Sequence, residues 1–363
     1  MVTKVSTKTR VAVLLEDKFE DSEFRIPTTA LKQAGAEVVI LGSRMNDQYQ
    51  GKRGTVSAEP DATATEVRSE DFDAIFIPGG MAPDHIRANP HAVRLVIDAI
   101  AQGKIIAAVC HGPQVLIDAD QLRGKQATGY RSLRKDIQNA GATYINEPVV
   151  VQGNLMTSRR PGDLPVFTTT LLTRLGLSLE ETKLPEVSDQ TYEWWKLGET
   201  WGGSSRLDIV NAINTALTGE HYTLKAFEQY VDKVADQEFK VIFSEVVGTK
   251  RQHVQLLEKR LAAFNEQPTW QTAGGEAYAT LQGWLQSNEN ETDILRRALG
   301  DVQTGVVDSY RLCGQLTDPL TVEIMEQIEG NLSQLEMRLG ELYRARMGSN
   351  VQPPMPTTFA VFG

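Results

Sequence analysis

The chain has 363 residues, which is more than one ordinary hydrophobic core accommodates and predicts two domains. Its composition, 41% hydrophobic and 23% charged, is that of a globular protein, and its longest apolar runs are far shorter than the ~20 residues of a membrane-spanning helix. The net charge of -10 argues against binding to nucleic acid or to an anionic membrane, and leaves open a small neutral or cationic molecule, or a peptide, as the substrate.

The N-terminal residues and the cysteines favour the cytoplasm. The first ten residues, MVTKVSTKTR, are polar and lack the apolar segment of a secretory signal. The two cysteines, Cys110 and Cys313, lie far apart in the sequence and cannot form a disulfide framework, which fits a reducing compartment. We therefore expect a cytoplasmic protein.

The first half of the chain alternates short apolar runs with amphipathic stretches. The apolar runs predict buried strands at residues 10–15, 36–41, 73–78 and 104–110. The amphipathic stretches predict helices at residues 22–34, 91–103 and 112–118. This alternation predicts an α/β domain over residues 8–176, with a parallel sheet covered by helices on both faces. Ligands of such sheets bind beyond the carboxyl ends of the strands.

The second half has the period of a helix from about residue 207 onward. Four long amphipathic segments form two pairs around a middle connection of residues 265–288, and predict an all-α four-helix bundle over residues 207–347. Residues 177–206 form the expected linker, whose aromatic cluster is too apolar for a free tether. Residues 348–363 form a Pro-containing tail that we expect to be extended.

The stretch 105-IIAAVCHGPQVL-116 puts Cys110 and His111 where a predicted strand ends and a helix begins. At such a junction the free N–H groups and the dipole of the first helical turn lower the pKa of a thiol. The same groups, together with Gly79 and Gly80 after the preceding strand, can hold an oxyanion. A cysteine in an apolar run is equally often a packed small hydrophobe. Local spacing leaves both interpretations open.

The group that would act on the thiol is also open at this point. His111 is adjacent, but neighbouring side chains on a sharp turn need not touch. A carboxylate that follows the first predicted strand would reach the same edge of the sheet. Three residues are candidates there: Glu16, Asp17 and Glu20.

The motif AAVCHGPQVL resembles the cysteine motif of the DJ-1/PfpI superfamily, in particular its PfpI-like branch of cysteine peptidases and stress proteins. Further segments resemble the family in the same order, at residues 17–23, 76–87, 122–142 and 149–167. The resemblance implies a flavodoxin-like, doubly wound sheet with the cysteine on a strained turn. It also implies a homo-oligomer, a dimer or higher.

The resemblance assigns roles to individual residues. Cys110 matches the reactive cysteine, His111 the motif histidine, and Glu20 the buried acid that hydrogen-bonds the thiol. Asp84 matches an acidic residue that orients the histidine of a neighbouring subunit in PfpI-like oligomers. The oxyanion site would be lined by the backbone of Gly79, Gly80 and His111.

The resemblance leaves the reaction open, because family members are described as peptidases, glyoxalases, isonitrile hydratases, chaperones and redox-responsive stress proteins. We expect a cysteine-dependent hydrolase or a glyoxalase-type enzyme that acts on small carbonyl or amide compounds in stress defence, without a cofactor. One alternative is a non-enzymatic redox sensor or holdase that uses oxidation of Cys110. A second alternative is an iron-handling protein.

The helical half resembles a ferritin-like domain, which raises the question of a metal site. Di-iron bundles need a Glu on each of two helices and a Glu-x-x-His on each of the other two. Here the residue three before His253 is Lys250, a cation where a carboxylate is needed. Glu220, His221 and His253 remain as a partial ligand set. We expect a degenerate bundle that binds no metal and serves assembly or partner binding.

Overall fold

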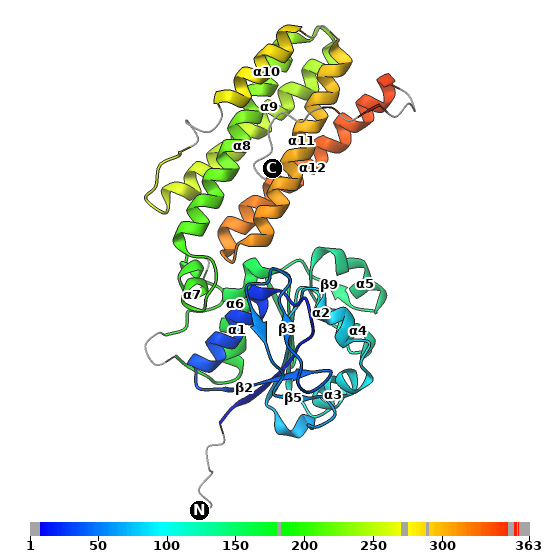
Figure 1. Cartoon of the computed structure of the whole chain (residues 1–363), viewed down its shortest axis with the longest axis vertical. Coiled ribbons are helices and arrows are strands. Elements are labelled where there is room, and N and C mark those ends of the chain that lie inside the picture. Colours follow the sequence, from blue (N-terminus) through cyan, green and yellow to red (C-terminus); the bar gives the residue numbers. More distant parts are fainter. Residues whose placement is uncertain are drawn as a thin grey trace, which may run out of the picture. The chain divides into compact units, whose positions relative to one another are not determined.

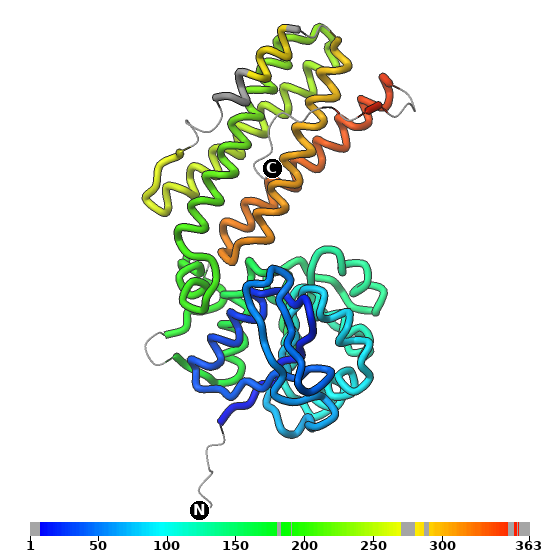
Figure 2. The backbone as a smooth tube through the Cα atoms, viewed as in Figure 1, coloured from blue at the N-terminus to red at the C-terminus, as the bar shows by residue number. Residues whose placement is uncertain are grey.

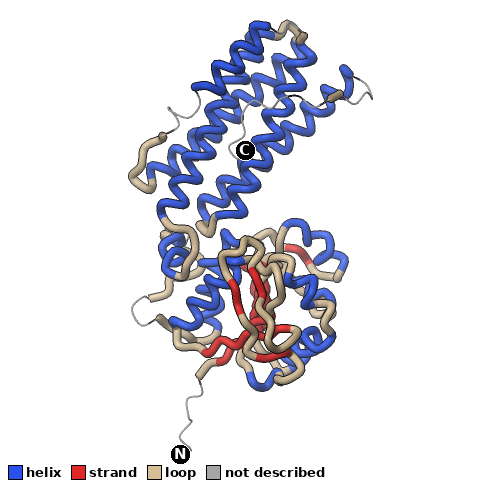
Figure 3. The backbone as a smooth tube through the Cα atoms, viewed as in Figure 1, coloured by secondary structure: helices blue, strands red, loops and turns tan. Residues whose placement is uncertain are grey.

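The computed structural model describes residues 8–179, 183–189, 191–269, 275–287, 290–347, 352–353 and 355. The described residues fall into two compact units. The first extends to Ser205 and includes Thr317–Pro319, and the second comprises the remainder from Arg206 onward. The first unit is built on a sheet and the second consists of helices, as Figures 1 and 3 show. The tail predicted at residues 348–363 lies almost entirely outside the described residues.

The main sheet of the first unit has seven strands in the order β10-β11-β7-β6-β1-β2-β5. Their bounds are β1 Arg10–Leu14, β2 Glu37–Gly42, β5 Ala62–Thr63, β6 Ala74–Ile77, β7 Ile105–Val109, β10 Val149–Gln152 and β11 Leu155–Ser158. The strand order reverses at β1, because β2 pairs with one of its edges and β6 with the other. In open α/β sheets this reversal creates a crevice beyond the carboxyl ends of the strands, where ligands bind.

Helices cover both faces of this sheet. They are α1 Asp21–Gln33, α2 Ala82–Ile86, α3 Pro90–Ala101, α4 Pro113–Asp118, α5 Arg134–Asn139, α6 Leu164–Arg174 and α7 Trp194–Thr200. Helix α1 contacts α6, whereas α2 and α3 contact α4. Figure 1 shows α1 and α6 on one side of the strands and α3, α4 and α5 on the other. The predicted doubly wound α/β fold is confirmed.

Short elements complete the unit. Two small ladders pair β3 Tyr49–Gln50 with β4 Ser57–Ala58, and β8 Gln126–Ala127 with β9 Thr143–Tyr144. Single 3-10 turns are η1 Ser69–Asp71, η2 Arg131–Leu133 and η3 Pro161–Asp163.

The sheet differs from the prediction at one edge, where β10 runs antiparallel to β11. These strands are joined by the two-residue turn Gly153-Asn154, and Gly153 has a φ of 60°. A turn this short connects only antiparallel neighbours, because a parallel crossover needs a dozen or more residues.

The second unit contains four long helices, at the positions that the helical period predicts. They are α8 Arg206–Lys233, α9 Gln237–Ala262, α11 Glu291–Gln315 and α12 Pro319–Met347. Figure 2 follows the chain through them. The middle connection also holds a shorter helix, α10 Gly275–Ser287, which the prediction missed. Its two buried leucines, Leu281 and Leu285, form a single pair at helical spacing. One pair is too short a pattern to predict a helix.

The predicted linker contributes to the core of the first unit. Trp194, Leu197 and Trp201 are buried there, in and just after α7. Burial of a large aromatic side chain removes much apolar surface from water, so such side chains are rarely found on a flexible linker. Among the described residues, no helix has the length and apolarity needed to cross a membrane.

Candidate functional site

Cys110 lies on the turn between β7 and α4, with a φ of 59°. This left-handed conformation is uncommon for a residue other than glycine and persists only where its surroundings hold it. The Cys110 N–H donates to the Ser158 carbonyl at 3.0 Å, and the Tyr130 N–H donates to the Cys110 carbonyl at 2.8 Å. The side chain is 5% exposed. The resemblance implies a strained strand-to-helix turn, and the structure has one.

Gly79 brings the loop after β6 against the cysteine. A Cβ atom at this position would lie 2.5 Å from Glu23 Oε2 and 2.7 Å from Cys110 Cβ, closer than real Cβ atoms approach. Only glycine therefore allows the acid and the cysteine to meet here. The Gly79 N–H donates to Glu23 Oε2 at 2.8 Å and fixes the carboxyl group.

Glu23, in the first turn of α1, is the acid that hydrogen-bonds the Cys110 thiol. Its side chain is completely buried. Burial, and after it the charge of Glu20, raises the pKa of Glu23 to about 8. At neutral pH this carboxyl group therefore carries a proton that it can donate.

Glu20, which the resemblance places at the thiol, has another role in the structure. It is the N-cap of α1: its Oε2 accepts from the Glu23 N–H at 2.8 Å and from the Ser22 hydroxyl. Its Oε1 lies 3.1 Å from the Arg53 guanidinium. Both oxygens are thus engaged away from the sulfur, which corrects the expectation. As the N-cap, Glu20 accepts hydrogen bonds at the start of the helix, whereas Glu23, three residues on, faces the sheet.

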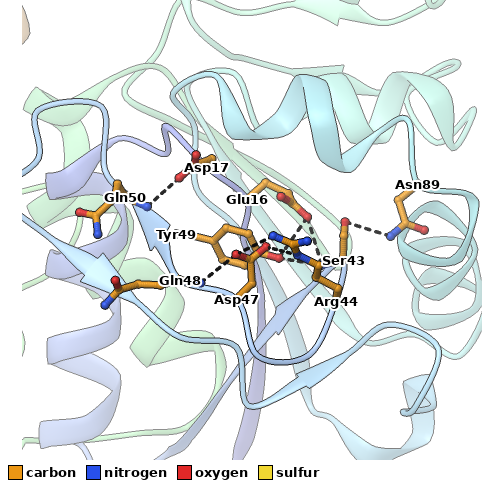
Figure 4. A network of polar contacts seen from close by, with 9 residues as sticks. All are labelled: Glu16, Asp17, Ser43, Arg44, Asp47, Gln48, Tyr49, Gln50 and Asn89. Carbon is orange, nitrogen blue, oxygen red and sulfur yellow. Dashed lines mark hydrogen bonds and ion pairs between the residues drawn. The ribbon is translucent and has the colours of Figure 1, made fainter.

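Glu16 and Asp17, the other two candidates, bind the segment that follows β2. Glu16 accepts from the Ser43 N–H at 3.0 Å and Tyr49 contacts it at 3.4 Å. Asp17 accepts from the Gln50 N–H at 2.8 Å. Figure 4 shows these two carboxylates within one polar network around Tyr49.

The thiol pKa shifts in the direction opposite to the sequence-based expectation. Burial, and after it the Glu23 charge, raises the pKa of Cys110, while the cation of Lys52 opposes them. The thiol and the Glu23 carboxyl group therefore act as one buried pair that shares its protons. When Glu23 is protonated, its negative charge is gone and its O–H can stabilise a thiolate.

His111 does contact its sequence neighbour. Its Nδ1 lies 3.3 Å from Cys110 Sγ and its Nε2 lies 3.5 Å from Ser132 Oγ. The imidazole also stacks on the Tyr130 ring, with 5.1 Å between centroids. Burial, and after it the Lys52 cation, lowers the pKa of His111 below 6.5. The imidazole is therefore neutral at pH 7 and can accept a proton.

Of the three backbone N–H groups expected to bind an oxyanion, one already has an acceptor. The Gly79 N–H is occupied by Glu23, as described above. In the described part of the chain the backbone N–H groups of Gly80 and His111 donate to no acceptor. These two amides are thus left without an acceptor, and their role as donors to an oxyanion stays a prediction.

Asp84 lies exposed on α2, 3.7 Å from the Arg87 guanidinium. The structure contains one chain, and the expectation that Asp84 orients His111 of a neighbouring subunit stays a prediction.

Sequence reasoning missed four residues around the cysteine: Glu23, Lys52, Tyr130 and Ser132. One signal for Glu23 was available, because it shares the buried face of α1 with Ile26 and Ala30, three and seven residues on. An acidic residue on the apolar face of a helix is buried together with the apolar residues when that face packs against the rest of the domain.

The bundle has a buried polar centre of its own. Lys250 Nζ lies 2.7 Å from Glu220 Oε1, and His253 Nδ1 lies 2.9 Å from Glu220 Oε2. The other imidazole nitrogen lies 3.0 Å from Asn331 Nδ2. Burial opposes ionisation of Glu220, but the Lys250 charge and the His253 hydrogen bond outweigh it and lower the pKa of Glu220 to about 2.

This centre does not fit an iron site. The ammonium of Lys250, which is fully buried, occupies the space beside Glu220 where a metal ligated by that carboxylate would lie. His221 faces Glu258 instead, at 3.9 Å. A cavity of about 30 Å³ beside Lys250 has room for a water molecule or two. Within the described ranges no three His, Cys, Asp or Glu side chains are placed to hold a metal ion.

We expect the Glu23→Gln variant to flatten the pH dependence of stability. The folded pKa of about 8 lies above the ordinary 4.5, so wild-type unfolding free energy is greatest below pH 4.5 and falls as pH rises toward 8. The loss should amount to roughly 3 to 5 kcal/mol. Urea unfolding at pH 5 and pH 8 measures it. Glu59→Gln, which removes an exposed carboxylate, is the control and should retain the wild-type decrease; a decrease that persists in Glu23→Gln would contradict the assignment.

Glu220→Ala should destabilise the bundle by about 3 to 5 kcal/mol, because it leaves the Lys250 ammonium buried without its carboxylate. The double variant Glu220→Gln/Lys250→Met removes both charges and should recover most of this loss. Urea unfolding followed by helical circular dichroism distinguishes them. Equal losses in both variants would show that the ion pair does not determine stability.

Comparisons with known proteins agree with this architecture. The DJ-1/PfpI family model matches residues 9–174. General stress protein 18 of Bacillus subtilis is 44% identical over 159 residues, which cover 44% of this chain and 92% of that protein. Protein/nucleic acid deglycase 2 of Escherichia coli is 40% identical over 168 residues, which cover 46% of this chain and 98% of that protein.

Both units have a counterpart in one solved structure. It is a two-domain protein from Anabaena variabilis, described as containing DJ-1/ThiJ/PfpI-like and ferritin-like domains. It is 50% identical, with a TM-score of 0.91 over 97% of this chain and 100% of that chain. The chain therefore belongs to the DJ-1/PfpI family through its first unit, which it joins to a ferritin-like helical bundle.

Proposed function

We propose that the protein is a cysteine-dependent enzyme that acts on small carbonyl or amide compounds in stress defence. The observation that carries the proposal is the convergence of Glu23 and His111 on the Cys110 sulfur, on a backbone held at a φ of 59°. A packed structural cysteine needs neither an acid nor a base at its sulfur. The names of the stress protein and the deglycase among the relatives support the same class of function.

With a carbonyl compound the proposed reaction is an addition. Neutral His111 takes the thiol proton, and a bond forms between Cys110 Sγ and the carbonyl carbon. The π electrons of the C=O bond move to oxygen, where the Gly80 and His111 amides stabilise the negative charge. A proton from Glu23 or from the imidazolium neutralises that oxygen, which gives a hemithioacetal.

With an amide the same attack gives a tetrahedral intermediate. It collapses when the C–N bond breaks and the amine leaves with the proton from the imidazolium. Water then hydrolyses the thioester and restores the free thiol. The surrounding residues support either route, because both need the same base and the same oxyanion donors.

The remaining parts of the proposal concern assembly. We infer that the protein acts in the cytoplasm as a homo-oligomer, and that Asp84 orients His111 of a neighbouring subunit. The exposure of Asp84 leaves it accessible to such a partner. The helical bundle would then serve assembly or partner binding rather than metal chemistry.

Cys110→Ala should abolish turnover, by at least about 100-fold, since the nucleophile is lost. A screen that compares α-oxoaldehydes with peptide amides supplies the measurement and also selects between the two routes. Cys313→Ala is the matched control, because this second cysteine is buried in the bundle and should leave the rate unchanged. Activity that survives Cys110→Ala on every substrate would overturn the proposal.

The protonated Glu23 also favours a second candidate function, that of a redox sensor. A carboxylic acid that donates to the sulfur would hydrogen-bond a sulfinate oxygen equally well.

Mass spectrometry after substoichiometric peroxide tests this second candidate. A sensor should form sulfinate at Cys110 before any other residue is oxidised, and Glu23→Ala should divert the product toward sulfonate. Oxidation spread over the methionines, with Cys110 unchanged, would exclude the sensor.

A further inference from the structure

Two carboxyl groups lie fully buried at the start of α1, those of Glu20 and Glu23, and the mechanism above uses only the second. Both residues are held at Gly79, whose carbonyl accepts from the Glu20 N–H at 3.1 Å and whose N–H donates to Glu23 Oε2 at 2.8 Å. Glu20 Oε2 also accepts from the Glu23 backbone N–H at 2.8 Å. The two carboxyl groups are therefore separated by little more than the length of one glutamate side chain.

Burial makes it unfavourable for both groups to be ionised at once. Each side chain is 0% exposed, so water does not screen the repulsion between two negative charges. At an effective dielectric constant of about 20, like charges ~7 Å apart shift each other's ionisation by about one to two pH units. One of the two carboxyl groups should therefore keep its proton at neutral pH, and the neighbouring groups decide which one it is.

The neighbours of the two carboxyl groups differ in charge. The Arg53 guanidinium lies 3.1 Å from Glu20 Oε1, and the Ser22 hydroxyl donates to Glu20 Oε2 together with the N–H described above. Among the residues that the structure describes, Glu23 forms no ion pair, and its partners are the Gly79 amide and the Cys110 thiol. A cation and two donors favour the ionised form of Glu20, which leaves the proton to Glu23.

The turn that carries Arg53, residues 51–56, is held in place by another carboxylate. Asp21, which is 1% exposed, accepts from the backbone N–H groups of Arg53 at 2.9 Å, Thr55 at 2.8 Å and Val56 at 3.0 Å. A Cβ atom on Gly51 would lie 2.4 Å from Asp21 Cγ, so the carboxylate fits only against glycine. The arginine is therefore presented to Glu20 by an ordered turn.

The titratable and charged groups around Glu23 come from three elements. They are Glu20 and Asp21 at the start of α1, Lys52 and Arg53 in the turn of residues 51–56, and Cys110 and His111 after β7. The two carboxylates and the two cations cancel in number, so the net charge does not explain why Glu23 keeps a proton. Their order in space does, because Glu20 turns Oε2 toward Glu23 and Oε1 toward Arg53.

We propose that Glu20 and Arg53 are positioning residues that keep the proton on Glu23. The guanidinium holds Glu20 as a carboxylate, and this fixed negative charge makes Glu23 the acid of the pair. The Glu23 O–H then donates to Cys110 Sγ when the thiol loses its proton to His111. The inference rests on the proposed function, since it concerns the acid of that same site.

The pH dependence of alkylation by neutral iodoacetamide tests the inference without turnover. With Cys313→Ala as the background, Cys110 is the only thiol of the chain. A bond forms between Sγ and the CH₂ carbon, the C–I bond breaks and iodide leaves, so the rate follows the thiolate fraction. The rate should rise with pH up to the pKa of Glu23, about 8, and level off above it, because an ionised Glu23 repels the thiolate.

Glu20→Gln removes the charge but keeps an oxygen that can cap the helix. This variant should move the break in the profile down by about one pH unit or more. Arg53→Met should move it in the same direction, because Glu20 without its cation takes up a proton. Arg53→Lys keeps a cation and should retain the wild-type profile, as should Glu59→Gln, the matched control that removes an exposed carboxylate.

Infrared absorption of the protonated carboxyl group gives a second readout that does not involve the cysteine. At neutral pH the band should be lost in Glu23→Gln and reduced in Glu20→Gln, since the proton then leaves Glu23 at a lower pH. Circular dichroism shows whether each variant is folded.

Two results in folded variants would overturn the inference. One is a break, and an infrared band, that Glu20→Gln leaves as in the wild type. The other is a break that moves equally in Arg53→Met and Arg53→Lys, which would mean that the packing of the arginine matters and its charge does not. Failure of the proposed function looks different, because turnover of every substrate is then absent while the alkylation profile still depends on Glu20.

Discussion

The contact between Glu23 and Cys110 across Gly79 is the constraint on which the rest of the site depends. It requires three strand ends to meet: β1 leads into the helix with the acid, β6 ends at the glycine, and β7 ends at the cysteine. The reversal of strand order at β1 brings these ends together. A sheet with another order would separate the acid from the thiol.

Much of this framework could be predicted from the sequence because parallel strands are buried on both faces. Val11 to Leu14 and Ile106 to Val109 are buried, so they appear as continuous apolar runs. The position of Cys110 after such a run, together with the following Gly-Pro pair, located the strand-to-helix turn. Glu23 was not among the candidates, which were Glu16, Asp17 and Glu20, and Glu20 was assigned to the thiol by the family resemblance. Helix α1 begins at Asp21, so Glu20 is its N-cap and Glu23, three residues on, is the first-turn residue that reaches the thiol.

Other features depended on packing that no local pattern records. Lys52, Tyr130 and Ser132 come from turns that are distant in sequence, and only the folded chain brings them to the cysteine. The direction of the thiol pKa shift also required the structure. The helix end at Cys110 favours a thiolate, but complete burial and a carboxyl group at the sulfur outweigh it. In the proposed mechanism the thiol is therefore not permanently ionised: His111 accepts its proton, and protonated Glu23 stabilises the thiolate.

Lys250 has a consequence for how the bundle acquires its central charge. Ferritin-like bundles that bind metal must obtain a cation from solution, and the occupancy of their centre depends on supply and on competing chelators. Here the cation that neutralises Glu220 is a side chain, delivered when the polypeptide is made. Its stoichiometry is fixed at one per chain. The positive charge at the centre of the helical unit is therefore encoded in the sequence and present in every copy of the chain.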